Sequence, residues 1–273
     1  TMAEPIALWD FETDLRDQIG TMHGEPKGNA RVEGGMLVLN GSSFVATKPL
    51  TSTLREKTLE AWVQLERLEQ AGGGVITVQD PRGVVFDSIV YAERQAKHWM
   101  AGSNGFRRTK DFHGPEETNR VVNQPVHLVI TYGNDGTVTG YRNGQPYGKP
   151  YQSDGPVTFN AGDSQVLFGL RHGMDDNGGR LLRGQIDEAR LYDRALSADE
   201  VAALAARDTD FVPKSDRLAA MTDAQRTSLT AWQTNLAQRQ AQLEASKSPE
   251  GLSSPWADFA HALFNLKEFI YVR

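Results

Sequence analysis

The 273-residue sequence contains no cysteine, and this absence excludes several kinds of chemistry. A chain without thiols has no disulfide framework, no cysteine-ligated zinc and no cysteine nucleophile. The sequence also lacks any apolar run near the roughly 18 residues that span a bilayer. It does not open with the basic and then apolar segment of a signal peptide. We therefore expect no membrane insertion.

Positive charge is scarce as well. Lys and Arg number 29 against 35 Asp and Glu, which gives a net charge of −6 at pH 7. Proteins that bind nucleic acids rely on clustered Lys and Arg, so no nucleic acid is expected as a partner. Hydrophobic residues make up 39% and charged residues 23% of the chain, which is typical of a globular protein.

Composition changes near residue 212 and divides the sequence into two parts. We expect a β-rich domain over 1–212 and a helical extension over 213–273. Short alternating or apolar runs bounded by turn residues predict strands over 5–12, 35–40, 43–47, 57–66, 75–79, 84–91, 97–101, 105–109, 126–132, 137–142, 165–170 and 184–192. Strands follow one another without intervening helices, so the sequence predicts an antiparallel sandwich or barrel.

Two turn signals predict local pairing. Asn134-Asp135-Gly136 predicts a hairpin between its flanking strands, because Asp and Gly tolerate the backbone angles of tight turns. Asn40-Gly41 likewise predicts that strand 43–47 pairs back on strand 35–40.

The run 57–66 alternates cleanly, with Glu60, Trp62 and Gln64 opposite its apolar face. Trp9 and Trp62 are interpreted as packing residues.

Helix signals gather toward the end of the chain. Ser197 with Glu200 forms a capping box that predicts a short helix to about Arg207. A second capping box at Thr222 predicts a helix over 222–246. A third helix is predicted over 255–270, and it is too apolar to stand alone in water.

Three segments carry a resemblance to a known family. Ile6-Ala-Leu-Trp-Asp-Phe-Glu12, Thr58-Leu-Glu-Ala-Trp-Val63 and the segment 184–201 resemble the first, inner and last strands of laminin-G-like, concanavalin A-like jelly-roll domains. The likeness covers about residues 5–207 and implies a mainly β fold, a two-sheet antiparallel β-sandwich.

A narrower likeness concerns the context of the chain. The segment 86–103 resembles lectin-like modules of large planctomycete secreted proteins that also carry cytochrome-c-like domains, and 256–271 is similar to their C-terminal ends. The resemblance implies the C-terminal piece of an extracytoplasmic multidomain protein, with other domains of the same parent chain as partners.

The resemblance also implies a structural Ca²⁺ that ties the first strand to the last. The matching positions are Asp10, the turn at Asn40 and Gly41, and Asp187. Oxygen ligands of this kind suit a hard cation. The alternative is that Asp187 pairs with Arg190 or caps a backbone amide. The oxygen-rich loop 175–179 is interpreted as a solvated turn.

No enzymatic activity is expected. Laminarinase-type relatives carry Glu-x-Asp-x-x-Glu on one strand, which places three carboxylates in the cleft. The nearest string here has Gln185 in place of the nucleophile and Arg190 in place of the acid.

Binding is the remaining hypothesis. Jelly-roll lectins stack sugar rings on aromatic side chains and bind hydroxyls with charged or amide groups. The block 86–113 is dense in both kinds, and the predicted ligand-binding residues are Asp87, Tyr91, Glu93, Arg94, Trp99 and Arg108. The alternative is that Tyr91 and Trp99 belong to the core. We expect a noncatalytic carbohydrate-binding module; the alternative is an intramolecular scaffold or protein–protein interaction domain that binds no sugar.

Overall fold

The computed structural model describes residues 3–175, 179–207 and 220–246. The chain divides into two compact units, Thr1–Lys214 and Ser215–Arg273. The third predicted helix, 255–270, lies outside the described residues.

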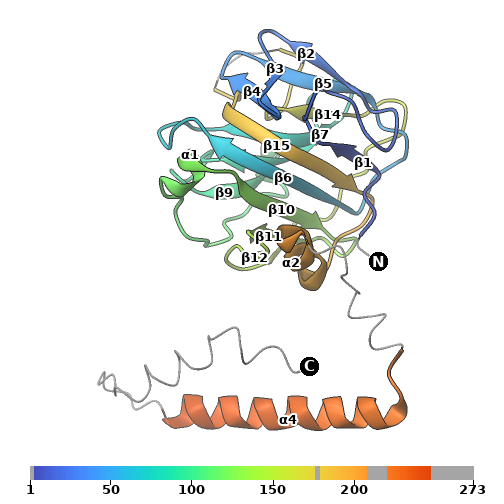
Figure 1. Ribbon diagram of the computed structural model, residues 1–273, viewed down its shortest axis with the longest axis vertical. Coiled ribbons are helices and arrows are strands. Elements are labelled where there is room, and N and C mark those ends of the chain that lie inside the picture. The colour runs from blue at the N-terminus through green and yellow to red at the C-terminus, as the bar shows by residue number, and fades with distance from the viewer. Residues whose placement is uncertain (1–2, 176–178, 208–219, 247–273) are drawn as a thin grey trace. The chain divides into compact units, whose positions relative to one another are not determined.

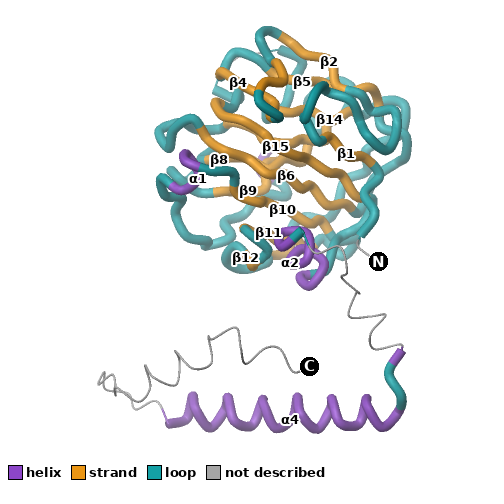
Figure 2. Tube along the Cα trace, viewed as in Figure 1, coloured by secondary structure: helices purple, strands orange, loops and turns teal. Residues whose placement is uncertain are grey.

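The first unit is built from two antiparallel sheets, shown as arrows in Figure 1 and in orange in Figure 2. Sheet A contains β12 (Gln145–Pro146), β11 (Thr137–Arg142), β10 (Val126–Tyr132), β6 (Lys57–Leu65), β15 (Arg183–Tyr192), β4 (Met36–Asn40) and β3 (Arg31–Glu33) in spatial order, with β1 (Ala7–Trp9) beside β15 and β13 (Tyr151–Gln152) beside β11. Sheet B contains β2 (Gly24–Lys27), β5 (Phe44–Pro49), β14 (Gln165–Phe168), β7 (Gly73–Gln79), β8 (Phe86–Tyr91) and β9 (Trp99–Ser103). The predicted mainly β, two-sheet antiparallel sandwich is confirmed.

Alternation along the strands builds the core between the sheets. Leu59 and Val63 of β6 point inward and are fully buried. Trp9 packs edge-on against Phe168 with ring centroids 4.9 Å apart, and its indole donates to the Met22 carbonyl. Trp9 is therefore a packing residue, as expected.

Two local predictions are wrong, and one is confirmed. The hairpin around Asn134–Gly136 forms, since β10 pairs with β11. However, β5 pairs with β2 and β14 in sheet B, whereas β4 lies in sheet A. The chain therefore crosses between sheets after Asn40 instead of turning back. The segment 105–109 is also no strand, because the 3₁₀ helix η1 (Asn104–Phe106) begins there.

Helices cover little of the sandwich. α1 (Arg120–Asn123) is a single turn, and α2 (Ala198–Ala206) begins with the predicted capping box at Ser197. Val201 and Leu204 of α2 pack with Val129 and Tyr192 on the outer face of sheet A. α2 therefore covers the end of that face formed by β10 and the last residues of β15.

The second unit contains α4 (Asp223–Ser246), which is described here by itself. Its Thr222 side chain and backbone bond Gln225 at the start of the helix. Trp232 is 77% exposed and Leu243 is 50% exposed.

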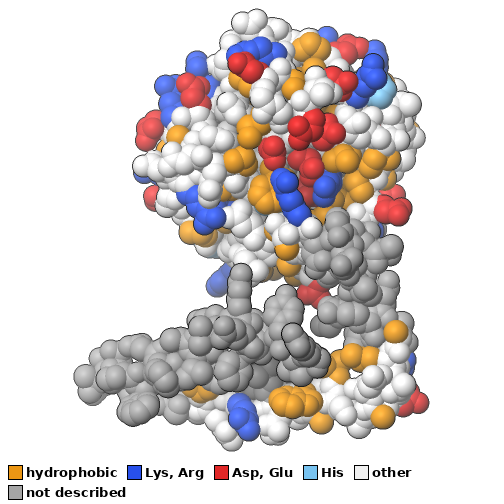
Figure 3. All heavy atoms as spheres, viewed as in Figure 1, with side chains coloured by type: hydrophobic (Ala, Val, Ile, Leu, Met, Phe, Trp, Pro, Cys, Tyr) orange, Lys and Arg blue, Asp and Glu red, His pale blue; other side chains and the backbone are white. Residues whose placement is uncertain are grey.

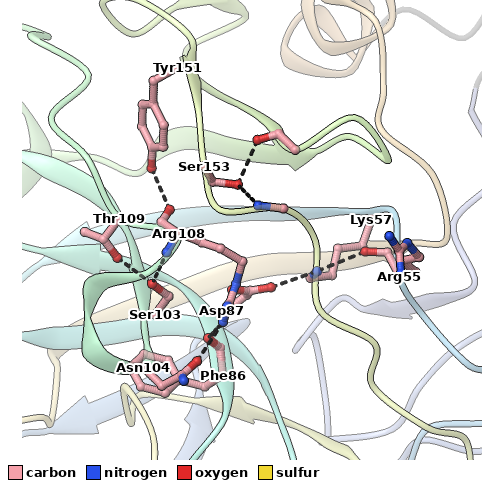
Figure 4. Close-up of polar contacts among 12 residues, drawn as sticks. Arg55, Lys57, Phe86, Asp87, Ser103, Asn104, Arg108, Thr109, Tyr151 and Ser153 are labelled. Carbon is pink, nitrogen blue, oxygen red and sulfur yellow. Dashed lines mark hydrogen bonds and ion pairs between the residues drawn. The ribbon is translucent and has the colours of Figure 1, made fainter.

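A buried charge cluster braces the two sheets (Figure 4). Lys57 of β6, in sheet A, lies 2.8 Å from the Asp87 carboxylate of β8, in sheet B, and both side chains are fully buried. The Arg108 Nε donates to the other carboxylate oxygen of Asp87 at 2.7 Å. Arg108 also donates to the Phe86 carbonyl and to the Asn104 side chain. One carboxylate therefore joins both sheets and the loop after β9.

Lys57 is a fully buried cation that lies close to two aromatic rings. Its ammonium group lies 4.6 Å from the Tyr132 ring centroid and 5.0 Å from that of Phe159. Burial lowers the pKa of Lys57, and the nearby Arg108 cation adds to this effect, while Asp87 opposes it. Burying an ion is unfavourable unless a partner compensates, so the stability of the sandwich depends on Asp87.

We expect Asp87→Asn to destabilise the fold by about 3–5 kcal/mol, because it leaves two buried cations without a counterion. Lys57→Met keeps the Asp87–Arg108 pair and fills similar volume, so its cost is smaller. Urea unfolding of both variants measures these free energies. Equal costs for the two variants would contradict the role given to Asp87.

The pH dependence of the same measurement provides a control. The pKa of Lys57 in the folded protein is lowered from the 10.5 of an exposed lysine. At pH values between the folded and the unfolded pKa, Lys57 therefore binds a proton in the unfolded chain that it does not bind in the folded one. The Lys57 contribution to stability therefore rises as pH increases toward 10.5. The difference in unfolding free energy between wild type and Lys57→Met should increase in that direction.

Candidate functional site

Most of the predicted ligand-binding residues lie inside the protein. Tyr91 and Asp87 are fully buried, Trp99 is 3% exposed and Arg108 is 5% exposed. The rings of Tyr91 and Trp99 contact each other in the core, 4.9 Å apart. Alternation along β8 was read correctly, but the shared face points into the sandwich. The assignment of these four residues to a ligand is corrected, because an external sugar has no access to them.

The other two predicted residues lie in the loop between β8 and β9. Glu93 pairs with Arg171 at 2.6 Å, and burial raises the pKa of Glu93. Arg94 is exposed and lies over the Phe106 ring at 5.1 Å. Both side chains contact protein partners, and the six residues do not form one surface.

The predicted calcium positions are not brought together as a ligand set. Asn40 is in register with Arg183, whereas Asp187 lies four residues further along β15. The Asn40 side-chain oxygen already accepts bonds from Ser42 and Ser43. Gly41 serves the turn: its φ is 78°, and an added Cβ would meet the Arg183 side chain.

The two carboxylates of the predicted calcium site, Asp10 and Asp187, also have protein partners. Asp10 accepts bonds from Gln18 and from the Glu12 backbone. Asp187 pairs with Arg207 at 3.3 Å rather than with Arg190. Within the described part of the chain, no group of three or more acidic or histidine side chains could hold a metal ion. These residues do not fit a calcium site in the arrangement seen here, and the loop 175–179 lies partly outside the described residues.

A surface that no other described element covers lies instead on the outer side of sheet A. We call it the open face and define it by Val38 and Asn40 of β4, Trp62 and Gln64 of β6, and Gln185 and Glu188 of β15. In register, Gln64 is opposite Gln185 and Trp62 is opposite Glu188. Figure 3 shows acidic, basic and apolar side chains gathered side by side over β15 and its neighbours.

A groove of about 410 Å³ occupies one part of the open face. Its lining residues are Arg31, Val38, Leu39, Asn40, Gln64, Leu65, Glu66, Val122, Arg183, Gly184 and Gln185. Val122 of α1 stands at one side, and the Gln64 amide nitrogen donates to the Val122 carbonyl at 2.8 Å. This volume lies within the range of small-molecule sites.

Trp62 is the aromatic side chain of the open face. It is partly buried and packs against the His127 ring at 4.8 Å. The Arg207 guanidinium lies over its ring at 5.1 Å and also reaches Asp187. Trp62 is therefore not part of the sandwich core. This corrects the prediction that it is a packing residue like Trp9.

Beneath Trp62, a buried acid is held by three partners. Glu60 bonds His127 at 2.9 Å and Tyr192 at 2.6 Å, and Arg190 lies 3.5 Å away. Burial alone would raise the pKa of Glu60, but the bond and charge of His127, with those of the other two partners, lower it. Arg190 also pairs with Glu188 at 2.8 Å, whose pKa burial raises. The bond from Glu60 holds His127, the ring against which Trp62 packs.

The family model of the concanavalin A-like lectin/glucanases superfamily matches residues 39–202, more than half of the chain. The chain belongs to this superfamily. No curated protein matches the sequence of this superfamily member. Within its described helices, none is long and apolar enough to cross a membrane.

Solved structures of low sequence identity share the fold. Domain 4 of AbnA, a GH43 extracellular arabinanase from Geobacillus stearothermophilus solved with arabinotriose, has a TM-score of 0.58 and 23% identity, covering 75% of this chain and all of that domain. Trypanosoma rangeli sialidase, solved with 2,3-difluorosialic acid, has a TM-score of 0.56 and 16% identity over 77% of this chain and 34% of the sialidase. The botulinum neurotoxin serotype D/C binding domain has a TM-score of 0.54 and 13% identity over 74% of this chain and 52% of that one.

Arg207 is expected to shield Trp62. It is the C-cap of α2 and adopts a left-handed conformation with φ 53°, which favours glycine. Arg207→Gly should therefore change stability by less than about 1 kcal/mol, because relief of backbone strain offsets the loss of an exposed pair. The same change should increase acrylamide quenching of Trp62 fluorescence.

The quenching is assigned by comparing Arg207→Gly with and without Trp62→Phe. Arg94→Gly is the matched control, because it removes another arginine that lies over an aromatic ring. Unchanged quenching in Arg207→Gly would contradict the shielding.

Proposed function

We propose that this protein is a noncatalytic carbohydrate-binding module whose ligand lies on the open face. The observation that carries the proposal is the Trp62 ring on a sheet surface beside two glutamines, Gln64 and Gln185, at the edge of the groove. A sugar that stacks on this ring displaces the exposed Arg207 side chain, which lies over it. An aromatic face packs against the apolar side of a sugar ring, and amides bond its hydroxyls. Pockets with an apolar contact and a few polar groups are typical ligand sites.

Several features support a noncatalytic role. On β15, Gln185 and Arg190 stand where laminarinase-type relatives carry carboxylates. Glu60 is 1% exposed, and its two oxygens already bond His127 and Tyr192. A carboxylate enclosed in this way has no path to a glycosidic bond, whereas glycoside hydrolysis needs two carboxyl groups flanking that bond.

The structural neighbours support a sugar ligand by analogy alone. One was solved with arabinotriose and one with a sialic acid derivative, and cell entry of a third, botulinum neurotoxin type C, depends on interaction with two ganglioside molecules. We also propose an extracytoplasmic location, in a parent chain whose other domains are further partners.

A second candidate function is an intramolecular scaffold that binds no sugar. The helix α4 favours it, because the exposed Trp232 is a large apolar side chain suited to a protein contact. The two functions are distinguished by whether the first unit binds polysaccharide.

Trp62→Ala is expected to weaken polysaccharide binding by about tenfold or more, because removal of an aromatic anchor costs on the order of 2 kcal/mol. Affinity electrophoresis against a polysaccharide panel, followed by calorimetric titration, measures the change. Trp232→Ala is the matched control: it removes an exposed tryptophan from the second unit and should leave affinity unaltered.

Wild-type protein that binds no member of the panel would overturn the proposal and favour the scaffold. Equal affinities of wild type and Trp62→Ala would mean that sugar binds elsewhere. Calcium binding stays a prediction, and repeating the titration in Ca²⁺ and in EDTA tests it.

A further inference from the structure

We infer that the ligand of the open face is an uncharged oligosaccharide chain that runs along β6 and β15. This inference rests on the proposed carbohydrate-binding function and adds the chemical class of the sugar.

Each charged residue that lines the groove already has a partner of opposite charge. Arg31 pairs with Glu33 at 2.6 Å. Arg183 lies 3.7 Å from Glu66 on the neighbouring strand. An acidic sugar would have to displace a carboxylate from one of these arginines, and a basic sugar would meet the arginines themselves.

The charged groups around Trp62 are paired in the same way. Asp187 contacts Arg207 at 3.3 Å, and Glu188 contacts Arg190 at 2.8 Å. Recognition of a sialic or uronic acid calls for a cation whose donors face the sugar carboxylate. Among the described residues around the open face, Arg190 and Arg207 direct donors to protein carboxylates, and Arg183 lies 3.7 Å from the Glu66 carboxylate.

The uncharged part of the floor supplies hydrogen bonds. The Gln64 nitrogen is held by Val122, which leaves its oxygen directed elsewhere as an acceptor. The Asn40 oxygen is held by Ser42 and Ser43, which leaves its nitrogen as a donor. Each of these amides is held in place by a protein partner on one of its atoms. The other atom can then bond sugar hydroxyl groups, which both donate and accept.

The length of the surface exceeds a single sugar. Glu66, Gln64 and Trp62 follow one another at every second position of the β6 segment, and two such steps span roughly 13 Å along a strand. The groove adds about 410 Å³ at the amide end. A chain of several sugar units therefore contacts the amides and Trp62 at once.

The test compares neutral and acidic polysaccharides by calorimetric titration of the full chain. Neutral arabinan, xylan, mannan and β-glucan are set against polygalacturonate, alginate and sialyllactose. We expect binding to a neutral member, with affinity that changes less than about twofold between roughly 0.05 and 0.5 M NaCl, because no ion pair forms with the ligand. The double variant Gln64→Ala/Gln185→Ala should lower that affinity at least about tenfold.

Glu33→Gln provides the sharpest control, since it releases the groove-lining Arg31 from its carboxylate while Glu33 itself does not line the groove. For a neutral ligand the affinity should stay within about twofold of wild type, whereas an acidic ligand would bind more tightly. Preferential, salt-sensitive binding of an acidic polysaccharide would overturn this inference and leave the proposed function standing. Absence of binding to both classes would overturn the proposed function itself.

Discussion

The fold depends on one buried carboxylate. Asp87 neutralises Lys57, which reaches it from the opposite sheet, and Arg108, which comes from the loop after β9. Two buried cations without this acid would carry a desolvation cost that packing cannot offset. The pairing holds β8 against β6. The inward-facing residues of the block 86–113 are therefore part of the core.

Because the inward side of that block is buried, we place the proposed binding surface on the outer side of sheet A. The inward face of β6 packs on sheet B, so only its outward residues are available. α2 covers one end of that outward face through Val201 and Leu204. The remaining part, between the end of α2 and α1, carries Trp62 and Gln64 and contains the groove. Arg207, the cap that ends α2, lies over Trp62 and so connects the helix to the binding surface.

Periodicity and turn chemistry made much of this fold predictable. Alternation placed Trp62 and Gln64 opposite the apolar side of β6, and the capping box at Ser197 located α2. The sequence could not reveal which face of β8 would be inward, because Tyr91 and Asp87 fit a ligand surface as well as a braced core. Asp87 is buried against Lys57, a cation that a local pattern gives no reason to place in a core. The crossing between sheets after Asn40 was missed for a similar reason: a turn signal does not say which strand follows as partner. The alternation of β6 does place Trp62 on the outward side, together with Gln64. That placement indicates the open face, and it does not agree with a packing role for Trp62 in the core.

The most direct test of the central claim is an amide and indole NMR titration with a neutral oligosaccharide. Each tryptophan has one indole N–H, so Trp62 on the open face and Trp99 in the core report separately. The account predicts that the Trp62 indole and the side-chain amides of Gln64 and Gln185 shift on titration, while the Trp99 indole does not. Shifts confined to Trp99 and its neighbours in the block 86–113, with Trp62 unmoved, would contradict it.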